Sequence, residues 1–322
     1  MSEQKYTNED LRIMQSWSLA RKIQVTQARI IEWYLKNKGK VYVSFSGGKD
    51  STVLLDMVRK LFPEVPAVFV DTGLEYPELR EFVKTIPNVT WIKPSMNFRK
   101  VIETYGYPLV SKEVSKRISE YFNAEKKGTL EKCLAYQEFN GIRQAPNGVS
   151  YYNKQQWHYL LDAPFKISHQ CCNVMKKKPS RKYEKETGNR PIIGTMACES
   201  QARKTAWKNH GCNAFDATRP SSQPMSFWTE QDVLEYISIY NIPYASVYGD
   251  IKQNEDGKYY TTKCNRTGCV FCAYGCHLEK EPNRFQKLKE THPKLWNYCM
   301  KPWENGGLGM KEVLDYIGVK TE

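Results

Sequence analysis

The sequence predicts an α/β protein with a doubly wound, mostly parallel sheet. Three short apolar runs, at 41–45, 67–71 and 89–92, are typical of strands buried on both faces. Each run is followed by a segment whose apolar residues recur at helical spacing, at 50–62, 77–84 and 97–104. Strands that alternate with helices in this way favour a parallel sheet with right-handed crossovers.

The other elements follow in chain order. Residues 1–38 are expected to form a pair of helices. The segment 111–165 is less regular: a polar helix begins at Ser111, and the aromatic residues of 151–159 are interpreted as packing groups, with a base-stacking platform as the alternative. A strand is expected at 192–195, and a helix begins at Thr229, where the spacing to Asp232 is that of a capping box. Residues 250–262 are polar and predict an exposed hairpin or loop.

This order of elements predicts three regions. They are an amino-terminal helical segment (1–38), an α/β domain (39–245), and a cysteine-rich, helical carboxyl-terminal region packed on the core (246–322). The apolar content of 40% is enough for a substantial core and excludes a wholly disordered chain.

Composition limits the partners and the compartment. The formal net charge of +13 points to a polyanionic partner, and charge alone does not separate a nucleic acid from a phosphorylated nucleotide. No apolar run approaches the ~20 residues that a membrane-spanning helix needs, and the first residues lack a signal-peptide pattern. We therefore expect a cytoplasmic protein without a membrane partner. Ten cysteines in such a chain indicate metal binding, catalysis or buried thiols more than disulfides.

The junction between the first strand and the first helix predicts an anion site. Gly47 and Gly48 permit a tight turn, which leaves unpaired backbone N–H groups at the positive end of the helix dipole. Lys49 adds a full positive charge. Nearby hydroxyl groups add hydrogen-bond donors: Ser44, Ser46 and Ser51. The loop is not a Walker A loop, because Val43 stands where that motif needs glycine, and no dinucleotide-binding G-x-G-x-x-G is present.

A second candidate binding segment follows the second strand. Asp71, Thr72 and Gly73 lie where that strand ends. The carboxyl ends of strands form the edge at which open α/β sheets bind ligands. The sequence therefore predicts that these residues lie near the anion site.

The cysteines form two pairs about a hundred residues apart. Cys171 and Cys172 are adjacent, and Cys269 and Cys272 have C-x-x-C spacing. Cys264 extends the second pair to the C-x₄-C-x₂-C spacing that also occurs in plant-type ferredoxins. Gathered thiolates favour zinc, or iron in an iron–sulfur cluster.

The loop SGGKDS at 46–51 resembles the SGGxDS loop of the PP-loop ATP pyrophosphatases, which have an adenine nucleotide alpha hydrolase-like, Rossmann-like fold. The resemblance implies that ATP binds here with Mg²⁺ and is cleaved between its α and β phosphates. It makes Lys49 and Asp50 the candidate catalytic residues, with Lys49 neutralising the triphosphate and Asp50 near Mg²⁺ or the attacking group. The nucleotide-binding candidates are listed here: Ser44, Ser46, Gly47, Gly48, Lys49, Asp50, Ser51, Asp71, Thr72, Gly73 and Arg203.

The cysteine pairs resemble the CC…CxxC signature of the adenylylsulfate reductase branch of the phosphoadenosine phosphosulfate (PAPS) reductase family. The segments 68–73, 227–237 and 242–244 resemble other motifs of the same family. The resemblance implies a [4Fe–4S] cluster, with zinc as the alternative metal. The implied ligands are Cys171, Cys172, Cys269 and Cys272, with Cys264 and Cys276 as substitutes. No ligand role is assigned to the remaining four, which are expected to be buried thiols: Cys133, Cys198, Cys212 and Cys299.

Arg203 resembles a family arginine that faces the nucleotide; the competing interpretation is an ion pair with Glu199. Two features depart from the reductases of this family. No cysteine follows Cys299, whereas those enzymes have a nucleophilic cysteine near the carboxyl terminus. The intact SGGKDS loop also suits ATP better than an already sulfated nucleotide.

We therefore expect an enzyme that converts ATP to AMP and pyrophosphate and activates an acceptor for sulfur transfer. Its candidate partners are a nucleotide substrate, a nucleic acid (tRNA or DNA) and a sulfur-donor protein. Two alternatives remain: a thiol-dependent PAPS or adenylylsulfate reductase, and a zinc-containing nucleic-acid-binding protein without catalysis. The missing terminal cysteine counts against the first alternative, and the SGGKDS loop against the second.

Overall fold

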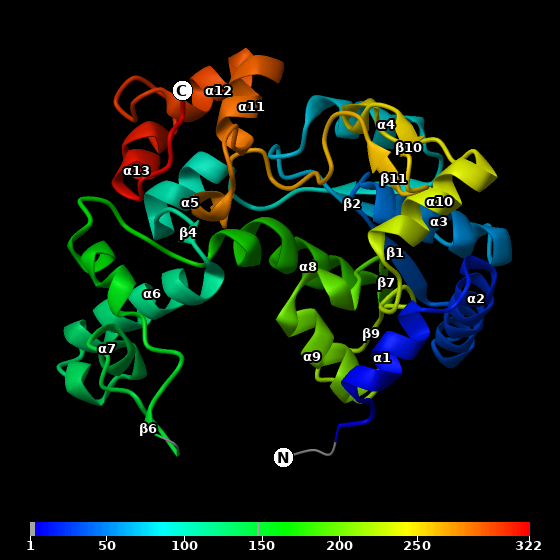
Figure 1. Cartoon of the computed structure of the whole chain (residues 1–322), viewed down its shortest axis with the longest axis horizontal. Helices are drawn as coiled ribbons and strands as arrows, with labels where there is room; N and C mark the ends of the chain where they lie inside the picture. The colour runs from blue at the N-terminus through cyan, green and yellow to red at the C-terminus, as the bar shows by residue number, and fades with distance from the viewer. Residues whose placement is uncertain (1–3, 147) are drawn as a thin grey trace. The chain divides into compact units, whose positions relative to one another are not determined.

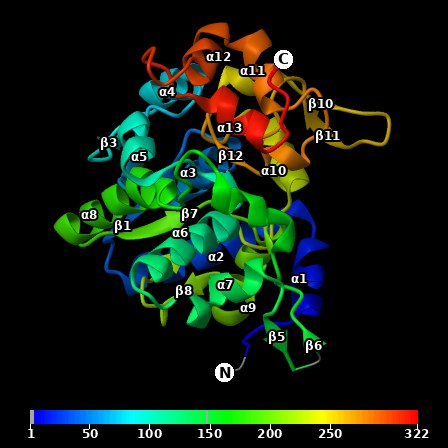
Figure 2. The same ribbon diagram turned by 90° about the vertical axis from the view of Figure 1, so that its left-hand side faces the viewer.

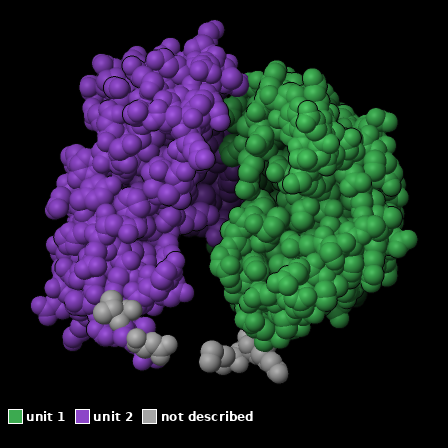
Figure 3. All heavy atoms as spheres, viewed as in Figure 1, with its two compact units in different colours: residues 1–71, 75–93, 179–268 green, residues 72–74, 94–178, 269–322 purple. Residues whose placement is uncertain are grey.

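The structure is a computed structural model that describes residues 4–146 and 148–322, and it separates into two compact units. Unit 1 contains the chain up to Asp71 together with 75–93 and 179–268, and unit 2 contains 72–74, 94–178 and 269–322 (Figure 3). Each unit is thus built from segments that are distant in the sequence. The predicted region boundaries at 38/39 and 245/246 stay predictions, as does a separate cysteine-rich region over 246–322.

Unit 1 is an α/β unit built on a six-stranded sheet with strand order β3-β2-β1-β7-β9-β8. All neighbouring strands are parallel except β8 and β9, which are antiparallel. The strands are β1 (Val41–Phe45), β2 (Ala67–Val70), β3 (Val89–Ile92), β7 (Arg190–Ile193), β8 (Asn213–Ala214) and β9 (Ser221–Ser222). The predicted mostly parallel α/β fold is confirmed.

Helices cover both faces of this sheet, which explains why its central strands β1 and β2 are mostly apolar (Figure 1). On one face, Val41, Val43 and Phe45 share a core with Trp33 of α2 (Leu19–Lys36) and Leu54 of α3 (Lys49–Leu61). On the other face, Tyr42 stacks edge-on against Tyr183 of α8 (Lys178–Thr187), and its hydroxyl donates to Glu184 at 2.8 Å. Successive residues of a strand point to opposite faces, so β1 contributes to both layers.

The remaining elements of unit 1 confirm most of the expected positions. The helices are α1 (Asn8–Gln15), α4 (Pro77–Thr85), α9 (Gln201–His210) and α10 (Glu230–Tyr240). Thr229 and Asp232 form the predicted capping box of α10. The polar segment 250–262 is a hairpin, as one of its two interpretations predicted, with β10 (Ile251–Gln253) antiparallel to β11 (Tyr259–Thr261).

Unit 2 is mainly helical, and Figure 2 shows its helices α6 and α7 side by side. Its helices are α5 (Phe98–Tyr105), α6 (Lys112–Lys126), α7 (Leu134–Phe139), α11 (Arg284–Thr291), α12 (Pro293–Met300) and α13 (Met310–Tyr316). Ser111 caps α6, as its predicted start requires. The strand β4 (Leu109–Val110) pairs in parallel with β12 (Ala273–Tyr274), and β5 (Gln144–Ala145) pairs with β6 (Gly148–Val149). The β4–β12 pair joins the segment before α6 to the residues that directly follow Cys272.

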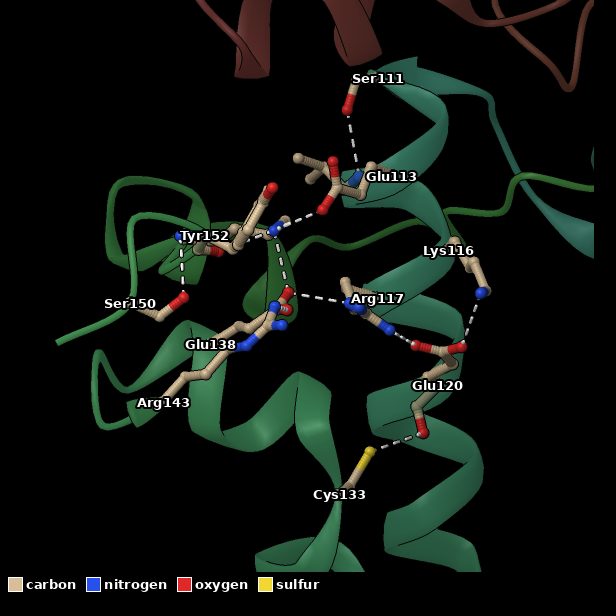
Figure 4. A network of polar contacts seen from close by, with 12 residues as sticks. Ser111, Glu113, Lys116, Arg117, Glu120, Cys133, Glu138, Arg143, Ser150 and Tyr152 are labelled. Carbon is tan, nitrogen blue, oxygen red and sulfur yellow. Dashed lines mark hydrogen bonds and ion pairs between the residues drawn. The ribbon is translucent and has the colours of Figure 1, made fainter. Parts of the chain in front are cut away.

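A buried carboxylate organises the region of unit 2 around α6 and α7 (Figure 4). Glu138 of α7 has a side chain with no solvent exposure, and it forms ion pairs with Arg117, Lys154 and Arg143. The Arg117 and Lys154 contacts are 2.8 and 2.9 Å long. Three cations on one buried carboxylate balance its charge and fix the loop around Lys154 against α6.

Within the residues that the structure describes, there is no helix of the length and apolar character that a membrane crossing demands.

Candidate functional site

The SGGKDS loop lies between β1 and α3 and is held by its own hydroxyl groups. Ser46 Oγ accepts the N–H of Gly48 at 3.3 Å, and Ser51 Oγ accepts the N–H of Ser46 at 3.2 Å. The Ser51 hydroxyl also lies 2.9 Å from the carbonyl oxygen of Gly48, to which it donates. The helix begins at Lys49, one residue before its predicted start. The serines that were predicted to bind phosphate therefore also set the shape of the turn.

Gly47 is required by this turn. Its φ of +74° lies in the left-handed region, and a Cβ atom at this position would stand 2.8 Å from Cγ2 of Val83 in α4. Any other residue would meet both backbone strain and a clash with a buried side chain. The two glycines were predicted to allow a tight turn, and the close approach of α4 is an additional constraint.

Lys49 is buried, and its charge is balanced by groups from distant parts of unit 1. Its ammonium Nζ lies 2.9 Å from Glu230 Oε1 and donates to the carbonyl oxygen of Asn265 at 2.6 Å. It also lies 5.4 Å from the ring centre of Tyr248, within cation–π range. The predicted role of Lys49 in neutralising a triphosphate stays a prediction, because in this structure its partner is a carboxylate.

The backbone N–H of Lys49 is one of the donors expected to hold an anion. It donates to the hydroxyl of Tyr248 at 3.2 Å, and that hydroxyl shares a 2.6 Å hydrogen bond with Thr267 Oγ1. Burial raises the pKa of Tyr248 to about 12, so the phenol stays neutral at physiological pH. A neutral hydroxyl thus lies where the sequence predicts a phosphate oxygen.

Asp50 follows Lys49 in the first turn of α3. Its Oδ1 atom is buried and has no hydrogen-bond partner among the described residues. Burial raises the pKa of this carboxyl above its ordinary value, while the positive charges of Lys49 and Arg266 act in the opposite direction. An unpaired buried carboxylate oxygen is costly, and a bound cation is one way to satisfy it.

Two arginines and one glutamate lie beside Asp50. Arg203 of α9 and Arg266 both form ion pairs with Glu199, which the competing interpretation of Arg203 predicted in part. Glu199 Oε2, which pairs with Arg203, also accepts the backbone N–H of Met196 at 2.9 Å. Burial and the neighbouring Arg266 both lower the pKa of Arg203, and Asp50 raises it. The loop thus contains one cation, Lys49, and two more, Arg203 and Arg266, interact electrostatically with its Asp50.

The second predicted segment is divided between the two units. Asp71 belongs to unit 1, where its Oδ2 atom accepts from Arg80 at 2.9 Å and its Oδ1 atom is buried without a partner in the described part of the chain. Thr72 and Gly73 are counted with unit 2, and Thr72 Oγ1 accepts the N–H of Leu74 at 3.1 Å. Their predicted nucleotide role stays a prediction, as does that of Ser44, the fourth residue of β1.

The four first-choice cysteines all belong to unit 2. Burial raises the pKa of the Cys171 thiol, and its interactions with Cys172, Cys269 and Cys272 raise it further, so the four sulfur groups influence one another. As they stand, however, no three His, Cys, Asp or Glu side chains of the described residues are arranged to hold a metal ion. The donor chemistry suits a soft metal, whereas the present side-chain arrangement is not that of a coordination shell.

The two substitute ligands, Cys264 and Cys276, belong to different units. Cys276 lies in unit 2 with its sulfur 3.0 Å from the carbonyl oxygen of Ala273, and Cys264 lies in unit 1. Of the cysteines without an assigned ligand role, Cys212 and Cys299 are buried as expected. Cys133 is partly exposed and Cys198 is exposed, contrary to the expectation of buried thiols. Cys198 interacts electrostatically with Asp50, so it lies near the loop rather than in the core.

Several groups around the loop were not identified from the sequence. They are Glu199, Glu230, Tyr248, Asn265, Arg266 and Thr267. Glu199 was considered only as a partner of Arg203. For the segment 265–267, the one local signal was the position of Arg266 two residues after Cys264. The others are brought to the loop by tertiary structure.

Comparison with known proteins identifies the family. The model of the phosphoadenosine phosphosulfate reductase domain matches residues 40–155 and 144–274. An uncharacterized protein of Methanocaldococcus jannaschii is 25% identical over 91% of this chain and 56% of its own length, so the chain spans about half of that relative. Sulfate adenylyltransferase subunit 2 of Salmonella arizonae is 24% identical over 71% of this chain and 66% of its own length. Among solved structures, the PAPS reductase of Candida auris has 15% identity and a TM-score of 0.40, over 79% of this chain and 98% of that one. The chain belongs to the phosphoadenosine phosphosulfate reductase domain family.

Proposed function

We propose that unit 1 binds ATP with Mg²⁺ at residues 46–51 and transfers AMP to an acceptor, releasing pyrophosphate. The observation that carries this proposal is the glycine turn at the start of α3, with Lys49 in it and Arg203 and Arg266 near its Asp50. Backbone donors at a helix amino terminus, together with fixed cations, suit a polyphosphate. The name of the relative sulfate adenylyltransferase subunit 2 describes adenylyl transfer and supports the same reaction class.

In this proposal an acceptor oxygen attacks the α phosphorus, and the bond to the oxygen that bridges the α and β phosphates breaks. Lys49 and the two arginines stabilise the negative charge that develops on the leaving pyrophosphate. The unpaired Oδ1 atom of Asp50 is the candidate Mg²⁺ ligand, because Mg²⁺ prefers carboxylate oxygens. The protein would contribute mainly by positioning and electrostatics.

A more specific part of the proposal concerns the acceptor and the role of the two cysteine pairs. We propose that the acceptor is activated for sulfur transfer, with a nucleic acid and a sulfur-donor protein as candidate partners. Cys171, Cys172, Cys269 and Cys272 are the residues that would hold a [4Fe–4S] cluster, or zinc, once their side chains reorient. Four thiolates from one unit are the donor set that such centres use. No step of the adenylyl transfer depends on this centre.

The family match favours a second candidate, a thiol-dependent reductase of a sulfated adenosine nucleotide. The same loop would then bind the phosphosulfate group instead of a triphosphate. The two candidates differ in their products, since one releases pyrophosphate from ATP and the other releases sulfite from the sulfated nucleotide.

The test measures ATP binding by calorimetry and pyrophosphate release in the presence of sulfate, tRNA or DNA as acceptor. Lys49→Ala is compared with Lys60→Ala, which removes a lysine from the same helix but whose partner is Asp56 at 2.8 Å. Loss of one stabilising cation is expected to lower the rate by about 10²–10³-fold. Wild-type rates in Lys49→Ala would contradict the assigned site, and thiol-dependent sulfite release without ATP cleavage would support the reductase.

A further inference from the structure

The cations around the loop are already paired with carboxylates. Lys49 pairs with Glu230, while Arg203 and Arg266 share Glu199. With Asp50, the site contains three cations and three acidic groups, so its formal charge is zero. A neutral site does not attract a polyanion strongly, and the proposed function needs the opposite.

We propose that Glu230 and Glu199 pair with the cations of the site until a nucleotide binds, that Glu230 then leaves Lys49, and that Arg266 then leaves Glu199 to become a phosphate ligand alongside Lys49 and Arg203. This inference rests on the proposed function and adds a binding residue and a gating step to it.

The exposed fractions of the paired side chains indicate which member of each ion pair would move. The Lys49 side chain is only 5% exposed, whereas that of Glu230 is 48% exposed. Glu230 is the first residue of α10 and is not part of the Thr229–Asp232 capping box. Its carboxylate can therefore turn towards solvent without disturbing the helix, leaving the fixed ammonium group of Lys49 for a phosphate.

In the pair of Glu199 with Arg266, the carboxylate is the fixed group. Its side chain is 11% exposed, and one of its oxygens accepts the N–H of Met196. Arg266 is 65% exposed, so here the arginine is the group that is free to reorient. An arginine that leaves a shared carboxylate can form a bidentate contact with phosphate.

Three consecutive residues connect this exchange to the loop. The carbonyl oxygen of Asn265 accepts from Lys49, Arg266 pairs with Glu199, and Thr267 is hydrogen-bonded to Tyr248. Tyr248 in turn accepts the backbone N–H of Lys49. A movement of residues 265–267 would therefore remove one acceptor from Lys49, separate Arg266 from Glu199 and break the hydrogen bond between Thr267 and Tyr248 at the same time. We name this segment the 265–267 strap.

The proposal predicts the direction in which anion affinity changes when Glu230 or Glu199 loses its charge. A purely structural role for the carboxylates predicts the opposite direction. Removing the negative charge of Glu230 or Glu199 frees a cation, so anion affinity should increase. If the carboxylates only position Lys49 and the arginines, the same substitutions should decrease affinity.

The experiment is calorimetric titration of the full chain with inorganic pyrophosphate, and with the α,β-methylene analogue of ATP plus Mg²⁺. Glu230→Gln and Glu199→Gln are expected to bind both probes several-fold more tightly than the wild type. Arg266→Gln is expected to bind about tenfold more weakly, which corresponds to about 1.4 kcal/mol. Melting temperatures of all variants establish that they are folded.

Matched controls remove the same charges elsewhere. Glu279→Gln removes a carboxylate that pairs with Arg284, and Arg12→Gln removes an exposed arginine that pairs with Glu9. Both should bind the probes like the wild type.

The inference is overturned if Glu230→Gln and Glu199→Gln bind more weakly, or if Arg266→Gln binds like the wild type, while Lys49→Ala loses binding. In that case the proposed ATP site stands and only the strap fails. If the wild type binds neither probe, the proposed function fails and the inference fails with it.

Discussion

Replacing Glu138 by glutamine should destabilise the α6–α7 region of unit 2. The glutamine keeps the size of the side chain but removes the charge that balances Arg117, Arg143 and Lys154 (Figure 4). Breaking a buried ion-pair network from one side usually costs 3–5 kcal/mol, because it leaves uncompensated charge. Arg117 keeps Glu120 at 2.6 Å and Lys154 keeps Glu113 at 2.9 Å. We therefore expect the lower end of that range, about 3 kcal/mol.

The loss should depend on pH in a defined direction. Burial raises the pKa of Glu138, but hydrogen bonds from Lys154 and Arg117 outweigh it, and the pKa lies below its ordinary value. A carboxyl whose pKa is lower in the folded protein stabilises it above the unfolded pKa of about 4.3, and this contribution is lost as the pH falls through the folded value. The difference between wild type and Glu138→Gln should therefore be full at pH 7 and shrink below about pH 4.

Hydrogen exchange read by mass spectrometry measures this effect locally, because the opening free energy of peptides from 112–139 reports on this region. Glu81→Gln is the control, since its pair with Lys84 is 2.6 Å long but has exposed side chains, and such pairs contribute about 0–1 kcal/mol. An opening free energy in Glu138→Gln that stays within 1 kcal/mol of the wild type at pH 7 would refute the reasoning.

Two further predictions concern the loop and the cysteines. Gly47→Ala should lower the free energy of unfolding by about 1–2 kcal/mol because of its positive φ, and it should abolish ATP binding through the clash with Val83. Chemical denaturation measures the first effect and calorimetry the second. Unchanged ATP binding would contradict the assigned geometry. Anaerobically prepared wild type should contain iron or zinc by elemental analysis, and Cys171→Ser should lose it while Cys133→Ser keeps it. Equal metal content in all three proteins would rule out the proposed ligands.

The local part of the site was predictable from the sequence. The apolar run at 41–45, the two glycines and the helical spacing after Asp50 are adjacent, so their structure depends on short-range preferences of the backbone and on burial. The same reasoning predicted β2, β3 and the capping box of α10. Family resemblance also predicted the type of sheet, which the fold confirms.

The surroundings of the loop were not predictable in the same way. Lys49 and Asn265 are 216 residues apart in the sequence, and no periodicity relates their positions. Their contact depends on how the chain returns to the sheet after passing through unit 2. Glu230 and Tyr248 reach Lys49 by the same long-range return.

The sequence by itself determined the parallel sheet, the strand–turn–helix form of the SGGKDS loop and the candidate residues on it, because strand, turn and helix preferences act between near neighbours. Only the tertiary structure decided what the cations of that loop contact. Charge pairing across distant segments depends on packing and burial, and in unit 1 these place carboxylates and a tyrosine hydroxyl beside the loop.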